Sequence, residues 1–218
     1  DRMGIDTIDR YAAMFGLGQS TGIELPERTG YVASPKTSED LGQEWYDGLL
    51  LPAAIGQGNT SATPLQIANY IATLVNGGTR YQAHLLKSVK SGSGGQTLEE
   101  TQPQALDEIN ISQSTTDTIL EGMRLLATEG SVSGYFANLP VSVGAKTGTA
   151  QVGSATQEAD AVFVCFAPYE DPEIAIALVV EHGGSGTELG AVAAEIISAY
   201  FSSTDTMEAV SGENTLLH

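Results

Sequence analysis

Apolar residues recur at helical spacing in four stretches of the chain. The stretches share a stripe of apolar positions three and four residues apart, and they lie at residues 5–15, 63–76, 114–129 and 187–201. The second has the strongest local signals, because Thr63 and Gln66 have the spacing of a capping box and Pro64 occupies the first helical position. Gly77 then ends the pattern. The sequence therefore predicts four helices.

The apolar stripes also predict which side chains face a core. In the helix at residues 114–129 the stripe consists of Ile119, Met123 and Leu126. In the last helix the inward positions are all apolar or aromatic, and they are Leu189, Val192, Ala193, Ile196, Ile197 and Tyr200. Both helices are expected to pack one face against other elements.

Three strand-like runs follow one another late in the chain. They are rich in strand-forming apolar residues and lie at residues 143–152, 160–167 and 174–182. Their connections are too short for a parallel crossover, which predicts antiparallel neighbours. With the last helix laid against them they predict an α+β fold, in which an antiparallel sheet is flanked by helices. Such a sheet has an open edge that something must cover.

The remaining segments have extended or irregular patterns. Residues 21–26 and 79–90 read as extended, and the glycine- and serine-rich residues 91–95 read as a hairpin tip. Residues 27–50 are polar and irregular, which predicts a long packed loop. Residues 202–218 are acidic and unpatterned, so we expect a disordered tail there.

The composition and charge exclude several classes of protein. Of the 218 residues, 41% are hydrophobic and 17% are charged, as in soluble globular proteins. Nine basic residues against 27 acidic ones give a net charge of −18, which would repel DNA and RNA, so nucleic acid is not an expected partner. The longest apolar runs, such as residues 174–180, are far shorter than the roughly 20 residues that span a bilayer.

Residues that could hold a metal are few and scattered. Cys165 is the one cysteine and lies in an apolar run, which is typical of a small buried core residue. His84, His182 and His218 show no metal-ligand spacing. We therefore expect no metal and no cofactor.

The segment Lys146-Thr147-Gly148-Thr149-Ala150 carries the most informative chemistry. It places one ammonium group and two hydroxyls on a short strand-like run, with a glycine that lets another backbone approach. That combination suits binding of a carboxylate and stabilisation of an acyl-transfer oxyanion. A phosphate-binding loop is the rival interpretation, but it needs glycine at positions 140 and 145, where the chain has Pro140 and Ala145.

Other catalytic patterns have weaker support. Residues 183–187 resemble a nucleophile elbow, Gly-x-Ser-x-Gly, but they have threonine where the last glycine is required. Ser185 is therefore interpreted as a turn residue. A spatial Ser-His-Asp triad stays open, since its members need not be neighbours in sequence. The acidic pairs at residues 99–100 and 107–108 are expected to be solvated charges in polar loops.

Several further segments share an order and spacing with one protein family. They are Met3-Gly4-Ile5-Asp6, Phe15-Gly16-Leu17-Gly18, Thr21-Gly22-Ile23-Glu24-Leu25-Pro26, Ala54-Ile55-Gly56-Gln57-Gly58, Thr63-Pro64-Leu65-Gln66-Ile67-Ala68 and Val162-Phe163-Val164-Cys165-Phe166-Ala167-Pro168. Together with Lys146-Thr147-Gly148, residues 1–201 resemble the C-terminal half of the transpeptidase domain of a class B, monofunctional penicillin-binding protein. The resemblance implies part of the fold shared by these proteins and serine β-lactamases, with the N-terminal part of the domain missing. The run Val179–Gly184 looks more like the cell-elongation subgroup than the division subgroup.

The resemblance implies a role for each residue of the motif. Lys146 would help to bind the substrate carboxylate and maintain a positive field. The hydroxyls of Thr147 and Thr149 would hydrogen-bond that carboxylate, and the backbone N–H of Thr149 would form half of the oxyanion hole. Gly148 would keep the strand clear for a substrate peptide that adds along it.

The nucleophile motif of the family is absent from these 218 residues. No serine lies three residues before a lysine, and no serine lies two residues before an asparagine, so neither Ser-x-x-Lys nor Ser-x-Asn occurs. In the family both motifs lie upstream of the Met-Gly-Ile-Asp segment. We therefore expect that the chain is a piece of a longer protein, that it contains no nucleophile, and that it is inactive alone.

The sequence thus predicts a peptidoglycan D,D-transpeptidase that β-lactams inhibit. The alternatives are a non-catalytic sensor of β-lactams or muropeptides on the same fold, and a scaffold in the wall-building complex. The expected partners are the peptidoglycan stem peptide, β-lactam antibiotics, the missing N-terminal half of the domain and proteins of the cell-wall elongation complex. The expected location is the extracytoplasmic face of the bacterial membrane, held by an N-terminal anchor outside this chain.

Overall fold

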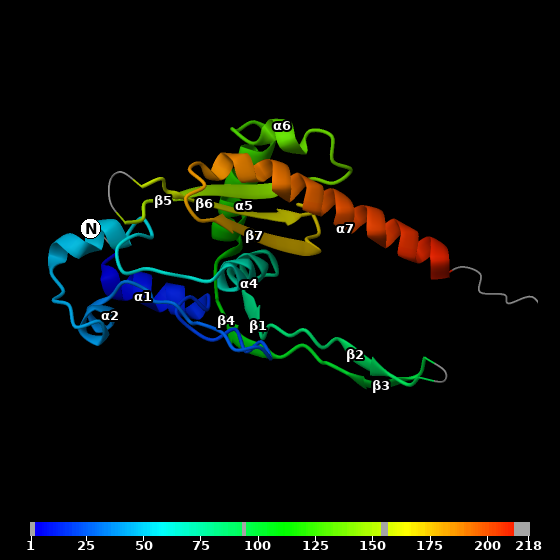
Figure 1. Ribbon diagram of the computed structural model, residues 1–218, viewed down its shortest axis with the longest axis horizontal. Coiled ribbons are helices and arrows are strands. Elements are labelled where there is room, and N and C mark those ends of the chain that lie inside the picture. The colour runs from blue at the N-terminus through cyan, green and yellow to red at the C-terminus, as the bar shows by residue number, and fades with distance from the viewer. Residues whose placement is uncertain (1–2, 93–94, 154–156, 212–218) are drawn as a thin grey trace, which may run out of the picture. The chain divides into compact units, whose positions relative to one another are not determined.

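The computed structural model describes residues 3–92, 95–153 and 157–211 (Figure 1). These residues divide into two compact units, Asp1–Asp117 and Thr118–His218. The division falls within helix α5 (Gln113–Thr128), whose first residues belong to the first unit. Each unit has its own hydrogen-bonded strands.

The N-terminal unit contains short helices around one longer helix. The helices in chain order are α1 (Ile5–Met14), α2 (Pro35–Asp40), the 3-10 helix η1 (Asp47–Leu49), α3 (Leu50–Ala53) and α4 (Pro64–Val75). The capping box predicted for α4 is confirmed. The Thr63 hydroxyl accepts the backbone N–H of Gln66 at 3.2 Å, and the Gln66 side-chain oxygen accepts the backbone N–H of Thr63 at 2.8 Å.

Gln66 also connects three loops of this unit. Its side chain is only 1% exposed. Its Nε2 donates to the carbonyl oxygens of Gln19 and Thr29 at 2.7 Å each and lies 3.5 Å from that of Gly16. One amide therefore caps α4 and donates to loop carbonyls that precede it in the chain by tens of residues.

Two strand pairs complete the N-terminal unit. Strand β1 (Thr79–Tyr81) pairs antiparallel with β4 (Ala105–Glu108), and β2 (Ser88–Lys90) pairs antiparallel with β3 (Thr97–Glu100). The β2–β3 ribbon extends away from β1 and β4 in Figure 1. These strands flank the hairpin tip expected at residues 91–95, of which residues 93–94 lie outside the described part. The acidic pairs expected in loops lie instead on β3 and β4.

The C-terminal unit is a three-stranded antiparallel sheet with helices packed on it. Its elements after α5 are α6 (Ser133–Phe136), β5 (Gly144–Ala150), β6 (Asp160–Ala167), β7 (Ile174–Val180), the 3-10 helix η2 (Gly186–Glu188) and α7 (Leu189–Ser211). The strand order is β5-β6-β7. The α+β class and the antiparallel pairing predicted for the three strands are confirmed.

The core of this unit lies between the sheet and α7, which crosses one face of the sheet in Figure 1. Phe163 and Cys165 of β6 are fully buried there, as are Ala193 and Ile197 of α7. Phe136 of α6 contacts Phe163 with 6.2 Å between ring centroids. Burial of these apolar side chains is the main driving force that holds α7 on the sheet.

The predicted helix faces were partly wrong. Val192 and Ile196 are 49% and 36% exposed, and Ile119 of α5 is 42% exposed. A helix that lies on a flat sheet buries mainly one row of residues four apart, and in α7 that row is Leu189, Ala193 and Ile197. The neighbouring apolar row remains at the surface.

The structure adds detail to three predicted segments. The expected loop at 27–50 contains α2, whose N-cap Ser34 accepts the backbone N–H of Thr37 at 3.1 Å. Residues 21–26, expected to be extended, belong to no strand, and the Glu27 carboxylate accepts the N–H groups at their start. Helix α7 continues beyond the expected end at residue 201 to Ser211, since residues 202–211 contain no glycine or proline, and residues 212–218 lie outside the described part.

Candidate functional site

The Lys146-Thr147-Gly148 motif lies in the middle of β5, as predicted. Strand β5 pairs with β6 alone in the sheet of described residues, so it is an edge strand. In the register, Lys146 faces Val164, Thr147 faces Phe163, and Thr149 faces Ala161. An edge strand turns every second N–H and C=O outward, which leaves part of its backbone available to a ligand.

The alternation of side chains divides the motif between the two faces of the sheet. Thr147 and Thr149 share the face of Ala145, which is fully buried in the core under α7. Lys146 points to the opposite face, and its Nζ donates to the carbonyl oxygen of Thr147. Lys146 and Thr149 are exposed, whereas Thr147 and Gly148 are half-buried.

This arrangement can bind an anionic, extended ligand. The ammonium group and the two hydroxyls border the same strand edge from its two sides. A peptide that paired with the edge would reach the backbone of β5, and its carboxylate could meet the hydroxyls or the ammonium group. A Cβ added at Gly148 would lie 3.2 Å from Cβ of Val162, so the glycine also allows close packing onto β6.

The loop after β7 contacts the motif strand, which the sequence analysis did not predict. Gly186 is buried against Gly148: a Cβ at Gly186 would lie 3.1 Å from the amide nitrogen of Gly148 and closer still to its carbonyl oxygen. Ser185 caps η2, because its hydroxyl accepts the N–H of Thr187 at 3.3 Å. The Ser185 side chain therefore has the turn role that was predicted.

Cys165 has no features of a nucleophile. It is buried in the core, and burial raises the pKa of its thiol to about 12. Within residues 3–92, 95–153 and 157–211, no three His, Cys, Asp or Glu side chains gather as metal ligands do. The two described histidines, His84 and His182, place Nδ1 near the carbonyl oxygens of Leu86 and Glu158.

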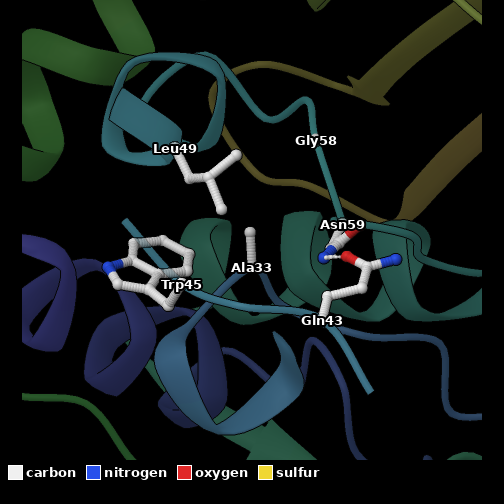
Figure 2. A pocket seen from close by; sticks show the side chains of 6 residues that line it. All are labelled: Ala33, Gln43, Trp45, Leu49, Gly58 and Asn59. Carbon is white, nitrogen blue, oxygen red and sulfur yellow. Dashed lines mark hydrogen bonds between the residues drawn. The ribbon is translucent and has the colours of Figure 1, made fainter. Parts of the chain in front are cut away.

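Two of the hollows in the N-terminal unit differ greatly in size. The smaller has a volume of about 60 Å³ and is lined by Ala33, Gln43, Trp45, Leu49, Gly58 and Asn59 (Figure 2). Asn59 Nδ2 donates to Gln43 Oε1 at 2.7 Å at its rim. This volume holds little more than a few waters. A larger groove of about 830 Å³ has a mainly apolar lining that includes Met3, Ile5, Ile8, Leu50 and Leu51.

Comparison with known proteins relates the whole of this architecture to one family. A family model for the penicillin binding protein transpeptidase domain matches residues 1–202. Penicillin-binding protein 2A of Bacillus subtilis (strain 168) is 36% identical over 193 residues, which make up 83% of this chain and 26% of that protein. Peptidoglycan D,D-transpeptidase MrdA of Escherichia coli (strain K12) is 32% identical over 212 residues, or 89% of this chain and 33% of that protein.

A solved structure has the same fold. In the complex between penicillin-binding protein PBP2 and MreC from Helicobacter pylori, the match has a TM-score of 0.75 and 27% identity, and it covers 93% of this chain and 36% of that chain. The chain thus spans about a quarter to a third of the length of the curated relatives. By its family match and its relatives, the chain belongs to the transpeptidase domain family of the penicillin-binding proteins and is part of a class B domain.

Proposed function

We propose that the protein containing this chain is a peptidoglycan D,D-transpeptidase, and that β5 forms one wall of its active site. The observation that carries the proposal is the placement of Lys146, Thr147 and Thr149 on an edge strand in a chain of this family. The name of the Escherichia coli relative, peptidoglycan D,D-transpeptidase MrdA, supports the reaction.

The residues of β5 would act on the acyl donor, a stem peptide that ends in D-alanine. The Thr147 and Thr149 hydroxyls donate hydrogen bonds to its terminal carboxylate, and Lys146 adds a positive charge beside them. The backbone N–H of Thr149 stabilises the oxyanion of the tetrahedral intermediate, where one such donor is worth about 3–4 kcal/mol. The same contacts would hold the carboxylate and carbonyl of a β-lactam.

The nucleophile of the proposed reaction lies outside this chain. The described part of the chain has no Ser-x-x-Lys, and neither do the remaining residues of the sequence. The 218-residue chain alone is therefore proposed to bind without acylation. A segment upstream in the intact protein supplies the serine and the Ser-x-Asn motif, and it is the closest partner of this chain.

We also propose a cellular setting for the protein. We place the protein in the elongation-type subgroup, at the extracytoplasmic face of the membrane, with elongation-complex proteins among its partners. The sequence similarity to MrdA and the structural similarity to a PBP2 found with MreC support this setting. Within the part of the chain that the structure describes, no helix is long and apolar enough to cross a bilayer.

A fluorescent penicillin tests the proposal. The 218-residue chain is expected to gain no covalent label, whereas the chain extended by its own upstream sequence is labelled once. Lys146→Ala in the extended protein should slow labelling, while Lys36→Ala, which removes an exposed lysine paired with Asp40, should not. A stoichiometric adduct on the 218-residue chain would contradict the assignment of the nucleophile to another segment.

Turnover separates the transpeptidase from a sensor on the same fold. The extended protein should exchange the terminal D-alanine of a pentapeptide stem for another D-amino acid. An extended protein that is acylated by penicillin without this exchange would support the sensor instead. If it is not labelled at all, the scaffold hypothesis gains and the transpeptidase proposal fails.

A further inference from the structure

The loop that follows β7 contacts three consecutive residues at the start of β6, which are Glu158, Ala159 and Asp160. We call residues 181–188 the clamp loop. The backbone N–H of His182 donates to Asp160 Oδ1 at 2.9 Å, and the N–H of Gly184 donates to the Ala159 carbonyl oxygen at 2.9 Å. His182 Nδ1 lies 3.2 Å from the carbonyl oxygen of Glu158, which requires a proton on that nitrogen.

The backbone of the clamp loop is shaped for these contacts. His182 has φ of 55°, in the left-handed region that few non-glycine residues adopt. Gly184 also has positive φ, at 72°. Such a conformation persists only where surrounding contacts hold it, and the Asp160 carboxylate supplies a charge-assisted hydrogen bond to the strained residue.

One residue of the clamp loop contacts the motif strand directly, and a second connection runs through β6. Gly186 is buried against the backbones of Gly148 and Val162. Asp160, which accepts the N–H of His182, lies on β6 as the register partner of Ala150, the residue directly after Thr149. Within the described sheet β5 has a strand neighbour on one side only, so the clamp loop adds a contact to β5 beyond its pairing with β6.

We propose that Asp160, through its hydrogen bond to His182, is a positioning residue that fixes the Thr149 end of β5 at the catalytic edge. The proposal rests on the proposed function for the identity of that edge. The role of Asp160 is indirect: its carboxylate holds the clamp loop, and the clamp loop packs against the strand. Loss of the carboxylate releases the loop and lets the Thr149 N–H leave its oxyanion-binding position.

Two substitutions of Asp160 distinguish the effect of losing the hydrogen bond from the effect of changing the side chain. Asp160→Ala removes the acceptor, whereas Asp160→Asn keeps an oxygen at the same place. Hydrogen exchange of the 218-residue chain, read by mass spectrometry on peptides that cover residues 144–150, measures the mobility of β5 directly. Asp160→Ala should speed exchange at residues 147–150 several-fold relative to residues 144–146, and Asp160→Asn should stay near the wild type.

Acylation of the extended protein gives the functional readout. Asp160→Ala should lower the first-order acylation constant for penicillin about 10-fold, because a misplaced oxyanion donor costs rate more than binding. The Thr149 hydroxyl moves with its N–H, so the dissociation constant of the initial complex should also rise, by no more than the 10-fold expected for Thr149→Val. Asp160→Asn should restore most of the rate. His84→Ala, which changes a histidine in the other unit, serves as the control and should leave both constants unchanged.

The two arms distinguish this inference from the proposed function. If hydrogen exchange of β5 is unchanged in Asp160→Ala, the positioning role is wrong, whatever the acylation rate of the extended protein. An equal loss of exchange protection along the whole strand would overturn it as well, since that indicates general destabilisation. If hydrogen exchange responds as expected but the wild-type extended protein is never acylated, the role of Asp160 in holding the clamp loop is supported and the transpeptidase assignment fails.

Discussion

The backbone of Gly186 packs directly against the backbone of Gly148, and the contact leaves no room for a side chain at Gly186. A Cβ at Gly186 would collide with the carbonyl oxygens of Gly148 and Val162 at once. The contact therefore requires glycine on the clamp loop, and it places η2 against the motif strand.

Gly186→Ala should displace the clamp loop from β5. We expect a loss of about 2–3 kcal/mol in the free energy of unfolding, because the added methyl meets rigid backbone that cannot shift cheaply. Urea denaturation measures it. Gly122→Ala on α5 is the matched control, since a Cβ there meets nothing within 4 Å and alanine should stabilise the helix by about 0.5–1 kcal/mol. Equal stability of the two variants would contradict the contact.

Gln66→Glu should strongly destabilise the protein. The substitution keeps the shape and the oxygen that caps α4 but removes the amide hydrogens that the carbonyls of Gln19 and Thr29 accept. A carboxylate at the almost fully buried position 66, facing two carbonyl oxygens that have lost their donor, should cost about 3–5 kcal/mol above neutral pH. Thermal unfolding followed by circular dichroism measures the loss. The exposed Gln113→Glu, on α5, should change stability by less than about 0.5 kcal/mol.

Glu27 should make part of the stability depend on pH. The Ser20 hydroxyl and the backbone N–H groups of Thr21 and Gly22 hydrogen-bond its carboxylate and lower the pKa from 4.5 to about 2. Because the folded pKa is depressed, this stabilisation is complete above about pH 4.5 and disappears as the pH falls toward 2. After allowance for solvent screening we expect it to be about 1 kcal/mol.

The comparison of wild type with Glu27→Gln isolates this contribution. The difference between their free energies of unfolding should be constant from pH 5 to 7 and shrink steadily between about pH 4.5 and 2. A difference that stays constant down to pH 2 would show that the carboxylate has an ordinary pKa in the folded protein.

The motif threonines should contribute to ligand binding through their hydroxyls. In the extended protein, Thr147→Val and Thr149→Val each remove one hydroxyl with little change in shape, and each should weaken the initial penicillin complex about 10-fold, as expected for a hydrogen bond to a carboxylate. Stopped-flow acylation separates this effect from the acylation step. Thr128→Val, whose hydroxyl bonds the Arg124 carbonyl on α5, should leave binding unchanged. Full affinity in both motif variants would remove the threonines from the proposed site.

Local signals explain which parts of the fold were predictable. The α4 boundaries follow from Thr63, Pro64 and Gln66, three neighbours in sequence, and β5 to β7 follow from apolar strand-forming runs with short connections. Helix α2 had the same kind of signal in Ser34 followed by Pro35, but its polar composition concealed it.

Tertiary contacts explain what was missed. The exposed sides of α5 and α7 depend on how each helix lies on its neighbours, which periodicity alone does not give. The second role of Gln66 depends on loops that pass the start of α4. Likewise, the glycines after β7 predicted a turn, but their contact with Gly148 exists only once the sheet has formed. The chemistry of their side chains singled out the motif residues of the proposed site, whereas no local signal indicated the loop that packs against them.

The outer edge of β5 has a consequence for the behaviour of the protein in solution. An unpaired strand edge that accepts a peptide can also accept the same edge of another copy, so ligand binding and self-association compete for one set of backbone groups. At low ionic strength the net charge of −18 keeps copies apart. Salt shortens the range of that repulsion from about 30 Å at 0.01 M to about 3 Å at 1 M. High salt is therefore expected to favour edge-to-edge pairing of copies, and a peptide bound along β5 is expected to oppose it.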